Sequence, residues 1–263
     1  MVFHDELVSQ VAPIVRHAGV IMRRYFATAC SVQEKDGGEL VTQADYAVEQ
    51  YLKDELHKVF AGAGFCAEES GELAHSSDYQ WVIDPIDGTS NFVRKIPYFC
   101  SSVALTRNDE PVFGMIYQPL QDELFWATHG QGAYKNGQRL SCDSPELFSS
   151  SLISFGLPQQ KEAPGRQALI AAARMVIERT GRMRHLGAAA LDLAYSASSS
   201  LDGAFFAGLR WWDVAAGLLL VREAGGRVTN FQGQPYERGQ KFCVAGSPLV
   251  HTELVAILSD YFS

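Results

Sequence analysis

The sequence predicts a mixed α+β and α/β fold, antiparallel-rich in its first half and alternating in its second. Apolar residues recur at helical spacing between Glu6 and Phe26, which predicts an amphipathic helix over 6–26. Several short strand-like runs then follow one another with turns between them, a pattern typical of antiparallel pairing. Beyond residue 150, strand-like and helix-like runs alternate, which is typical of an α/β arrangement.

The first half contains most of the expected strands. We expect the polar, glycine-containing stretch 34–39 to be a loop from which Lys35 reaches the site, and a second helix to follow over 43–60. Strands are then expected over 64–67, 80–83, 100–107, 112–118 and 123–128. A hairpin is expected to turn at Asn136-Gly137, because both residue types tolerate positive φ.

The second half follows a polar linker at 141–149. Its expected strands are 151–155, 182–185, 203–206 and 242–245, and its expected helices are 166–180, 188–198, 213–223 and 249–259. We therefore expect an N-terminal α+β subdomain over 1–145, which carries most metal ligands, and a C-terminal α/β subdomain over 146–263.

Composition narrows the class of protein. The 263 residues are 47% hydrophobic, enough for a large core, and the net charge of −8 argues against a nucleic-acid partner. The five cysteines are scattered without Cys-x-x-Cys spacing, so we expect reduced thiols in a cytoplasmic protein rather than a disulfide framework or a zinc site. No apolar run reaches about 18 residues, so no membrane span is expected.

Two carboxylates, a glycine and a hydroxyl follow the apolar strand at 81–83. Asp84-Pro85 is expected to end this strand, because proline fixes its own φ and restricts the residue before it. Asp87 is then expected in a turn where Gly88 adopts positive φ and lets backbone N–H groups approach an anion. Either dipeptide alone is more often an ordinary turn. Together behind a strand, however, they predict a magnesium and phosphate site, because Mg²⁺ takes one or two carboxylates and fills its octahedron with water and phosphate.

Two further acids lie where other elements begin or end. Glu68 follows the strand expected over 64–67, and Asp213 begins the helix expected after Trp211-Trp212. Taken alone, Glu68 is more typical of a solvated loop, and Asp213 is more typical of a helix N-cap. Three acidic sites at strand or helix ends favour a shared metal site.

The residues resemble those of the Mg²⁺-dependent inositol monophosphatase family, which shares a fold with the fructose-1,6-bisphosphatases. The resemblance covers nearly the whole chain, and its most specific part is the Asp-Pro-Ile-Asp-Gly-Thr run from Asp84 to Thr89. The other matching motifs are Leu40-Val41-Thr42-Gln43-Ala44-Asp45, Glu68-Glu69-Ser70, Gly130-Gln131-Gly132, Gly187-Ala188-Ala189 and Trp212-Asp213. The resemblance implies a layered α-β-α-β-α sugar-phosphatase fold with the site where the two halves meet.

The resemblance also implies two Mg²⁺ ions, and a third, weaker ion near Glu68. The first ion would be held by Glu68, Asp84 and the Ile86 carbonyl. The second would be held by Asp84, Asp87 and Asp213, so that Asp84 bridges the two. Lithium sensitivity and a homodimer are implied in the same way.

Thr89 is implied to position or deprotonate the attacking water, with Asp45 orienting its hydroxyl and with Glu68 and Asp87 as further catalytic residues. The backbone N–H groups of Gly88 and Thr89 would receive phosphate oxygens. We expect Asp87→Asn to lower turnover by orders of magnitude without unfolding the chain.

The substrate contacts implied are Gly187, Ala188, Ala189 and Phe206. Phe206 stands where the inositol phosphatases have an acid, seven residues before the Trp-Asp aspartate, and Ala188 stands where they have threonine. Two polyol contacts are therefore absent. The expected substrate is a small polyol or sugar phosphate; the alternatives are adenosine 3′,5′-bisphosphate and histidinol phosphate. An alternative of another class is a regulatory binding protein that retains the metal site.

Overall fold

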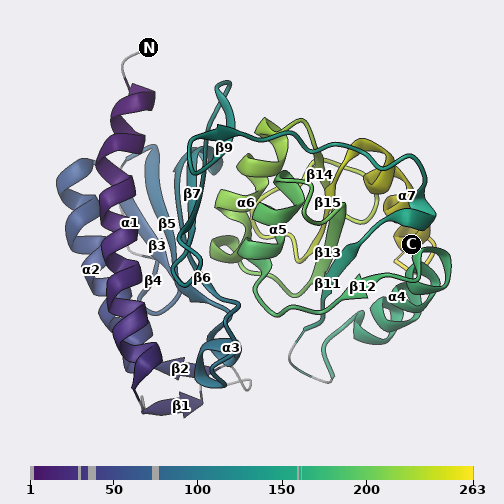
Figure 1. Ribbon diagram of the computed structural model, residues 1–263, viewed down its shortest axis with the longest axis horizontal. Helices are drawn as coiled ribbons and strands as arrows, with labels where there is room; N and C mark the ends of the chain where they lie inside the picture. The colour runs from purple at the N-terminus through teal and green to yellow at the C-terminus, as the bar shows by residue number, and fades with distance from the viewer. Residues whose placement is uncertain are drawn as a thin grey trace.

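The computed structural model describes residues 3–28, 31–34, 40–72, 77–158, 160 and 162–262. Figure 1 shows five layers: helices α1 and α2, an eight-stranded sheet, helices α5 and α6, a five-stranded sheet, and helices α4 and α7. The layered α-β-α-β-α arrangement expected from the sequence is confirmed. The division into subdomains at residue 145 stays a prediction.

The outer layer on the N-terminal side consists of two amphipathic helices. These are α1 (Phe3–Ala27), slightly longer than predicted, and α2 (Gln43–Val59), close to its predicted bounds. A short hairpin of β1 (Val32–Glu34) and β2 (Leu40–Thr42) joins them. The expected loop residues 35–39, including Lys35, lie outside the described residues, as does Cys30.

The eight-stranded sheet has the order β10-β9-β8-β7-β6-β5-β3-β4. All its neighbouring strands are antiparallel except β3 and β5. Its members are β3 (Gly64–Ala67), β4 (Gly71–Glu72), β5 (Tyr79–Asp87), β6 (Cys100–Arg107), β7 (Glu110–Gln118), β8 (Glu123–Thr128), β9 (Gly132–Lys135) and β10 (Gln138–Arg139). The predicted hairpin at Asn136-Gly137 is confirmed, with positive φ at both residues.

The prediction that Asp84-Pro85 ends its strand is wrong. Strand β5 continues to Asp87, and its pairing with β6 shifts register between Asp84 and Asp87. Proline lacks an N–H and is tolerated at a bulge, where one ladder bond is missing in any case. Asp87 is therefore the last residue of a strand rather than part of a turn, and Gly88 is the N-cap of the short helix α3 (Thr89–Val93).

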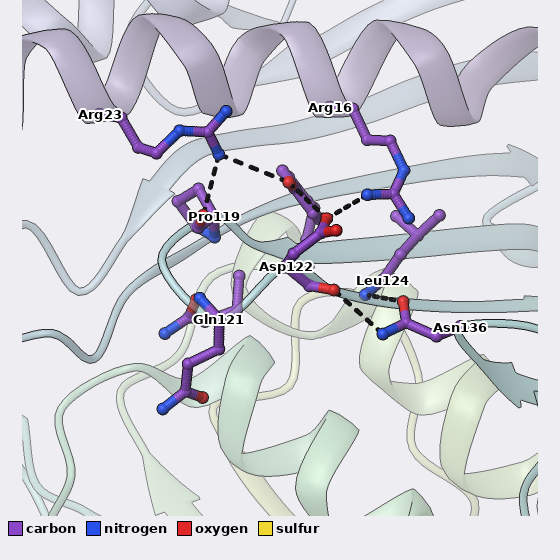
Figure 2. A network of polar contacts seen from close by, with 9 residues as sticks. Arg16, Arg23, Pro119, Gln121, Asp122, Leu124 and Asn136 are labelled. Atoms are coloured by element: carbon purple, nitrogen blue, oxygen red, sulfur yellow. Dashed lines mark hydrogen bonds and ion pairs between the residues drawn. The ribbon is translucent and has the colours of Figure 1, made fainter.

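Helix α1 is fixed to the loop between β7 and β8 by two arginines (Figure 2). Arg16 donates to the carboxylate of Asp122, which also accepts a hydrogen bond of 2.8 Å from the Tyr117 hydroxyl. Arg23 donates to the Pro119 carbonyl at 2.9 Å. The Asn136 side chain joins the same loop to the next hairpin, with its amide nitrogen 3.0 Å from the Asp122 carbonyl. The long outer helix is thereby anchored by polar contacts as well as by its apolar face.

Helices α5 (Ala189–Ala197) and α6 (Trp211–Glu223) form the middle layer. Two glycines let this layer pack closely. A Cβ atom on Gly217 would lie 2.6 Å from the Cβ of Leu193 in α5, and one on Gly114 in β7 would lie 2.9 Å from the Cα of Ala216. The two helices thus contact each other and the eight-stranded sheet at nearly backbone distance.

The five-stranded sheet has the order β12-β11-β13-β15-β14 and is mixed. The β11 strand pairs in parallel with β12 and β13, whereas β15 pairs antiparallel with β13 and β14. Its members are β11 (Ile153–Gly156), β12 (Met183–Arg184), β13 (Gly203–Ala207), β14 (Arg227–Thr229) and β15 (Phe242–Gly246). A short 3₁₀ turn, η1 (Phe148–Ser150), precedes it, and helices α4 (Arg166–Thr180) and α7 (Pro248–Ser259) cover its outer face.

Candidate active site

A cavity of about 630 Å³ lies where the eight-stranded sheet, α5 and the five-stranded sheet meet. All but one of the site residues predicted from the sequence line it. These are Glu68, Asp84, Ile86, Asp87, Gly88, Thr89, Gly187, Ala188, Ala189, Phe206 and Asp213. The exception is Asp45, which is fully buried behind Thr89. The fold thus gathers residues that are more than 100 positions apart in the sequence.

Asp84 carries the most unfavourable electrostatics in this cavity. The side chain is 2% exposed, and its Oδ1 atom has no hydrogen-bond partner. Burial raises the pKa of this carboxyl well above its usual range, and the neighbouring charges of Glu68, Asp87 and Asp213 raise it further. A buried carboxylate oxygen without a partner is costly, so the site favours an arriving cation.

The donor set suits a hard divalent ion. Within the described ranges, no three or more His, Cys, Asp or Glu side chains already stand as a metal-binding group. The three carboxylates around Asp84, those of Glu68, Asp87 and Asp213, are nevertheless close enough to raise its pKa. All these donors are oxygen atoms, which Mg²⁺ prefers, and the orphaned Oδ1 of Asp84 faces no competing donor. The residues present therefore fit a Mg²⁺-type ion.

Asp87 joins the two halves of the chain. Its Oδ1 accepts the Ala189 N–H at 3.2 Å and its Oδ2 accepts the Ala190 N–H at 2.7 Å, so the carboxylate caps helix α5. Burial raises the pKa of Asp87 to about 7, although the backbone donors oppose this shift. An asparagine at this position would turn an NH₂ group toward one of these N–H donors, so one of the two capping hydrogen bonds would be lost. The structure thus gives Asp87 a second, structural role that the sequence did not reveal.

Gly88 and Thr89 follow directly. Gly88 has φ +91, as expected, and a Cβ there would lie 3.0 Å from the Tyr98 carbonyl oxygen and 3.1 Å from the Cβ of Ala188. The Thr89 hydroxyl lies 2.9 Å from the Ile86 carbonyl oxygen and 3.3 Å from Oδ1 of Asp45. The carbonyl keeps a second lone pair for another partner.

Asp45 is held firmly from behind. Its Oδ2 accepts the Thr42 N–H at 2.8 Å and the Thr42 hydroxyl at 2.6 Å in a capping box at the start of α2. Its other oxygen therefore faces Thr89. This arrangement explains why a buried aspartate at a helix start can orient a hydroxyl in the next layer.

Glu68 lies at the end of β3, and its backbone N–H donates to the Ile83 carbonyl at 3.1 Å. The buried Glu49 of α2 accepts the next two backbone N–H groups, those of Glu69 at 2.7 Å and Ser70 at 3.0 Å. Glu49 thus holds the loop that carries Glu68. This role of Glu49 was not predicted; the only signal in the sequence is an acid on the inward side of an amphipathic helix.

Asp213 is the third residue of α6, because the helix begins at Trp211 rather than at the predicted residue 213. Its Oδ2 accepts the Arg210 N–H at 2.7 Å. Asp213 therefore caps the helix from within its first turn, close to the N-cap role considered from the sequence.

The loop at 186–189 is held by Asn91. Its side-chain amide donates to the Tyr98 carbonyl at 2.8 Å and to the Leu186 carbonyl at 2.7 Å. A Cβ on Gly187 would lie 3.3 Å from the same amide nitrogen. Asn91 therefore sets the position of the predicted substrate loop, which was not anticipated.

A family model described as the inositol monophosphatase family matches residues 4–261. The Nus factor SuhB of Escherichia coli strain K12 is 37% identical over 251 residues, and the match covers 94% of each chain. The inositol-1-monophosphatase of Mesorhizobium japonicum is 38% identical over 241 residues, covering 90% of each chain.

The crystal structure of the extragenic suppressor protein SuhB from Bartonella henselae superposes with a TM-score of 0.91 at 34% identity. The match covers 96% of this chain and 98% of that one. The family model and the relatives each span nearly the whole chain, as the resemblance noted in the sequence does. This chain therefore belongs to the inositol monophosphatase family.

Proposed function

We propose that this protein is a Mg²⁺-dependent phosphomonoesterase that hydrolyses a small phosphate ester of a polyol, a sugar or a similar alcohol. The observation that carries the proposal is the buried, unpartnered Oδ1 of Asp84 among three further carboxylates in a cavity between the two sheets. Membership of the inositol monophosphatase family and relatives named inositol-1-monophosphatase support it.

Five groups of this chain would hold two Mg²⁺ ions: the carboxylates of Glu68, Asp84, Asp87 and Asp213 and the Ile86 carbonyl. When bound, the ions would acidify a water molecule and neutralise charge on the phosphate and the departing alkoxide. A third, weaker site near Glu68 belongs to the same proposal.

The attacking water would be positioned by the Thr89 hydroxyl. That hydroxyl can pass its own hydrogen bond to Oδ1 of Asp45, 3.3 Å away, and accept one from water. The backbone N–H groups of Gly88 and Thr89 would donate to phosphate oxygens. The water oxygen then bonds to phosphorus, the ester P–O bond breaks, and the alcohol leaves after taking up a proton.

The test is phosphate release from inositol 1-phosphate, glycerol phosphate, sugar phosphates, histidinol phosphate and adenosine 3′,5′-bisphosphate, with Mg²⁺ or with a chelator. We use Glu68→Gln as the blank, because Asp87 also caps α5, and Glu146→Gln as an exposed control. We expect release that needs Mg²⁺ and falls at least about 100-fold in the Glu68→Gln protein. Equal release with chelator, or from the blank, would refute the proposal.

A second candidate function is regulatory binding, since relatives 37% identical to this chain are named Nus factor SuhB. The role would then rest on a protein surface rather than on the carboxylates. Complementation of a strain that lacks the gene separates the two: rescue by Glu68→Gln would favour the binding role, and loss of rescue would favour catalysis.

The homodimer, lithium sensitivity and cytoplasmic location stay predictions. No helix among the described residues is both long and apolar enough to cross a membrane. The described cysteines, Cys66, Cys100, Cys142 and Cys243, are free thiols.

A further inference from the structure

The half of the cavity away from Asp84 has a composition of its own. Three segments form it, with numbers 155–158, 185–189 and 206–210, and Arg166 at the start of α4 completes it. If the carboxylates hold the ions and the scissile phosphate, as proposed above, this half receives the alcohol part of the substrate. Its side chains therefore decide which alcohols fit.

Its floor is apolar. Phe206 lies opposite Gly156 in the parallel pairing of β13 with β11, and a Cβ on Gly156 would lie 2.7 Å from Cδ1 of Phe206. The glycine thus provides the space that the phenyl ring fills, and Phe206 is 1% exposed. A ring fixed in this way presents carbon atoms to the cavity and cannot accept a hydrogen bond from a polyol hydroxyl.

The carboxylate of Asp192, which also lines the cavity, is already engaged. Its Oδ1 accepts the Tyr98 hydroxyl at 2.5 Å and its Oδ2 accepts the Ser154 hydroxyl at 2.6 Å. It is 1% exposed, so little of it meets a ligand. Dense hydroxyl recognition by carboxylates is thus missing where the alcohol would lie.

The wall carries two arginines instead. The guanidinium of Arg166 makes one long hydrogen bond, 3.4 Å from Nε to the Pro158 carbonyl oxygen, and the guanidinium of Arg210 makes none among the residues described. Neither is in an ion pair there, although Arg238 binds two carboxylates elsewhere in the fold.

The same wall brings the two arginines to one side of the cavity. Gly208, with φ +84, packs against Pro158: a Cβ on Gly208 would lie 3.2 Å from the Cβ of Pro158. The contact brings Gly208, two residues before Arg210, against Pro158, whose carbonyl accepts the hydrogen bond from Arg166. In a chain with eight more acidic than basic side chains, two cations on one cavity wall that form no ion pair with a described carboxylate fit an anionic ligand.

We propose that the substrate's alcohol part carries a second anionic group, a carboxylate or a phosphate, which binds Arg166 and Arg210. This inference rests on the proposed function and narrows its substrate class. Asp213 lies beside the Arg210 backbone, its Oδ2 2.7 Å from that nitrogen. The carboxylates of Glu68, Asp84 and Asp87 repel a second anion, so the molecule can bind in one orientation, with the scissile phosphate toward these metal ligands.

Matched substrate pairs test this. Benzyl phosphate and 4-carboxybenzyl phosphate differ in one carboxylate; fructose 6-phosphate and fructose 1,6-bisphosphate differ in one phosphate. The proteins are the wild type, the double variant Arg166→Gln with Arg210→Gln, and Arg174→Gln, an exposed arginine on α4 that does not line the cavity. We expect the wild type and Arg174→Gln to prefer the anionic member of at least one pair by roughly 10-fold or more in kcat/KM.

The double variant should lose that preference while its turnover of the neutral member changes less than about threefold. Which pair shows the preference tells a carboxylate from a phosphate. The inference is wrong if neither pair shows a preference, or if the double variant slows both members of a pair equally, because the arginines would then serve the scissile phosphate.

A binding measurement keeps this inference separate from the proposed function. In an NMR titration without turnover, the wild type should bind 4-carboxybenzyl alcohol at least about tenfold more tightly than benzyl alcohol, and the double variant should bind both alike. If the wild type shows this binding difference but releases no phosphate from any substrate, the proposed function is overturned and the inference about the arginines is not. Equal binding of the two alcohols by the wild type, together with no preference in the fructose pair, would overturn the inference.

Discussion

Asp192 is a buried carboxylate whose ionisation should cost stability, and Asp192→Asn should remove that cost. Burial raises its pKa to about 7, even though hydrogen bonds from Ser154 and Tyr98 oppose the shift. Asparagine keeps an oxygen for Tyr98, and the Ser154 hydroxyl can accept from the new amide while it donates to the Arg184 carbonyl, 3.3 Å away. The substitution therefore removes a charge without stranding a polar group.

The sign follows from proton linkage. An aspartate in the unfolded chain has a pKa of about 3.9, so between that pH and pH 7 the folded chain binds more protons at Asp192 than the unfolded chain does. Stability therefore falls as pH rises through this window. A folded pKa of about 7 implies a loss of roughly 2–3 kcal/mol between pH 5 and pH 8. For a chain of this size that loss corresponds to roughly 5–10 °C in Tm.

The assay is urea unfolding of the wild type, Asp192→Asn and the exposed control Asp260→Asn at pH 5 and pH 8, all with chelator. The same other buried acids are present in all three proteins, but the charge of Asp192 contributes to the raised pKa of Asp87, so the difference between wild type and variant reports Asp192 together with this coupling. We expect Asp192→Asn to lose roughly 2–3 kcal/mol less than the wild type between the two pH values. If both lose the same amount, Asp192 is already ionised in the folded chain at pH 5 and the burial argument fails.

Three further predictions concern the backbone and the surface. Gly88→Ala should lower the free energy of unfolding, measured in urea, by roughly 1–3 kcal/mol more than Gly239→Ala does. Gly239 has nearly the same φ, +89, but no atom lies within 4 Å of the position a Cβ would take there. Equal losses in the two variants would mean that the close approach at Gly88 is unimportant. Asn91→Ala should lower the free energy of unfolding by roughly 1–2 kcal/mol, because two partly buried carbonyls lose their donor, and should raise KM; an unchanged KM would show that the 186–189 loop is held by other contacts. Asp122→Asn should lower the free energy of unfolding by less than about 1 kcal/mol at pH 7, because the ion pair between Asp122 and Arg16 is exposed. The hydrogen bond from Tyr117 and the nearby arginines hold the pKa of Asp122 below its usual range, so its contribution should disappear as pH falls, and a difference that persisted at pH 3 would contradict this account.

Elements with strong local signals were predictable from the sequence. The bounds of β3, β6, β8 and α4 are those predicted, because apolar runs of strand or helix period end there at turn residues. The strand β14 was missed, since three residues are too few to show a period. Strand β5 was cut short because a proline in a bulge looks the same in sequence as a proline that ends a strand.

The identities of the acids were predictable, and their partners were not. Asp84 and Asp87 stand out through the motif that contains them, whereas the Ala189 and Ala190 donors that bind Asp87 lie about 100 residues later and are backbone groups without a sequence signature. Glu49 was missed for a related reason. A glutamate in a helix is usually solvated, and only the fold shows that this one faces the backbone of Glu69 and Ser70.

The site therefore depends on how the two sheets are joined. Asp87 contributes a carboxylate to the cluster around Asp84, and the same carboxylate accepts the first N–H groups of α5. Under the proposed function, an ion that draws on the oxygens of Asp87 would compete with those N–H groups for lone pairs, while it would relieve the repulsion that raises the pKa of Asp84. Because two carboxylate oxygens offer about four lone pairs, both demands can be met only if α5 stays where Asn91 and Gly88 hold it. Loosening this junction should thus weaken Mg²⁺ binding even when every proposed ligand is intact.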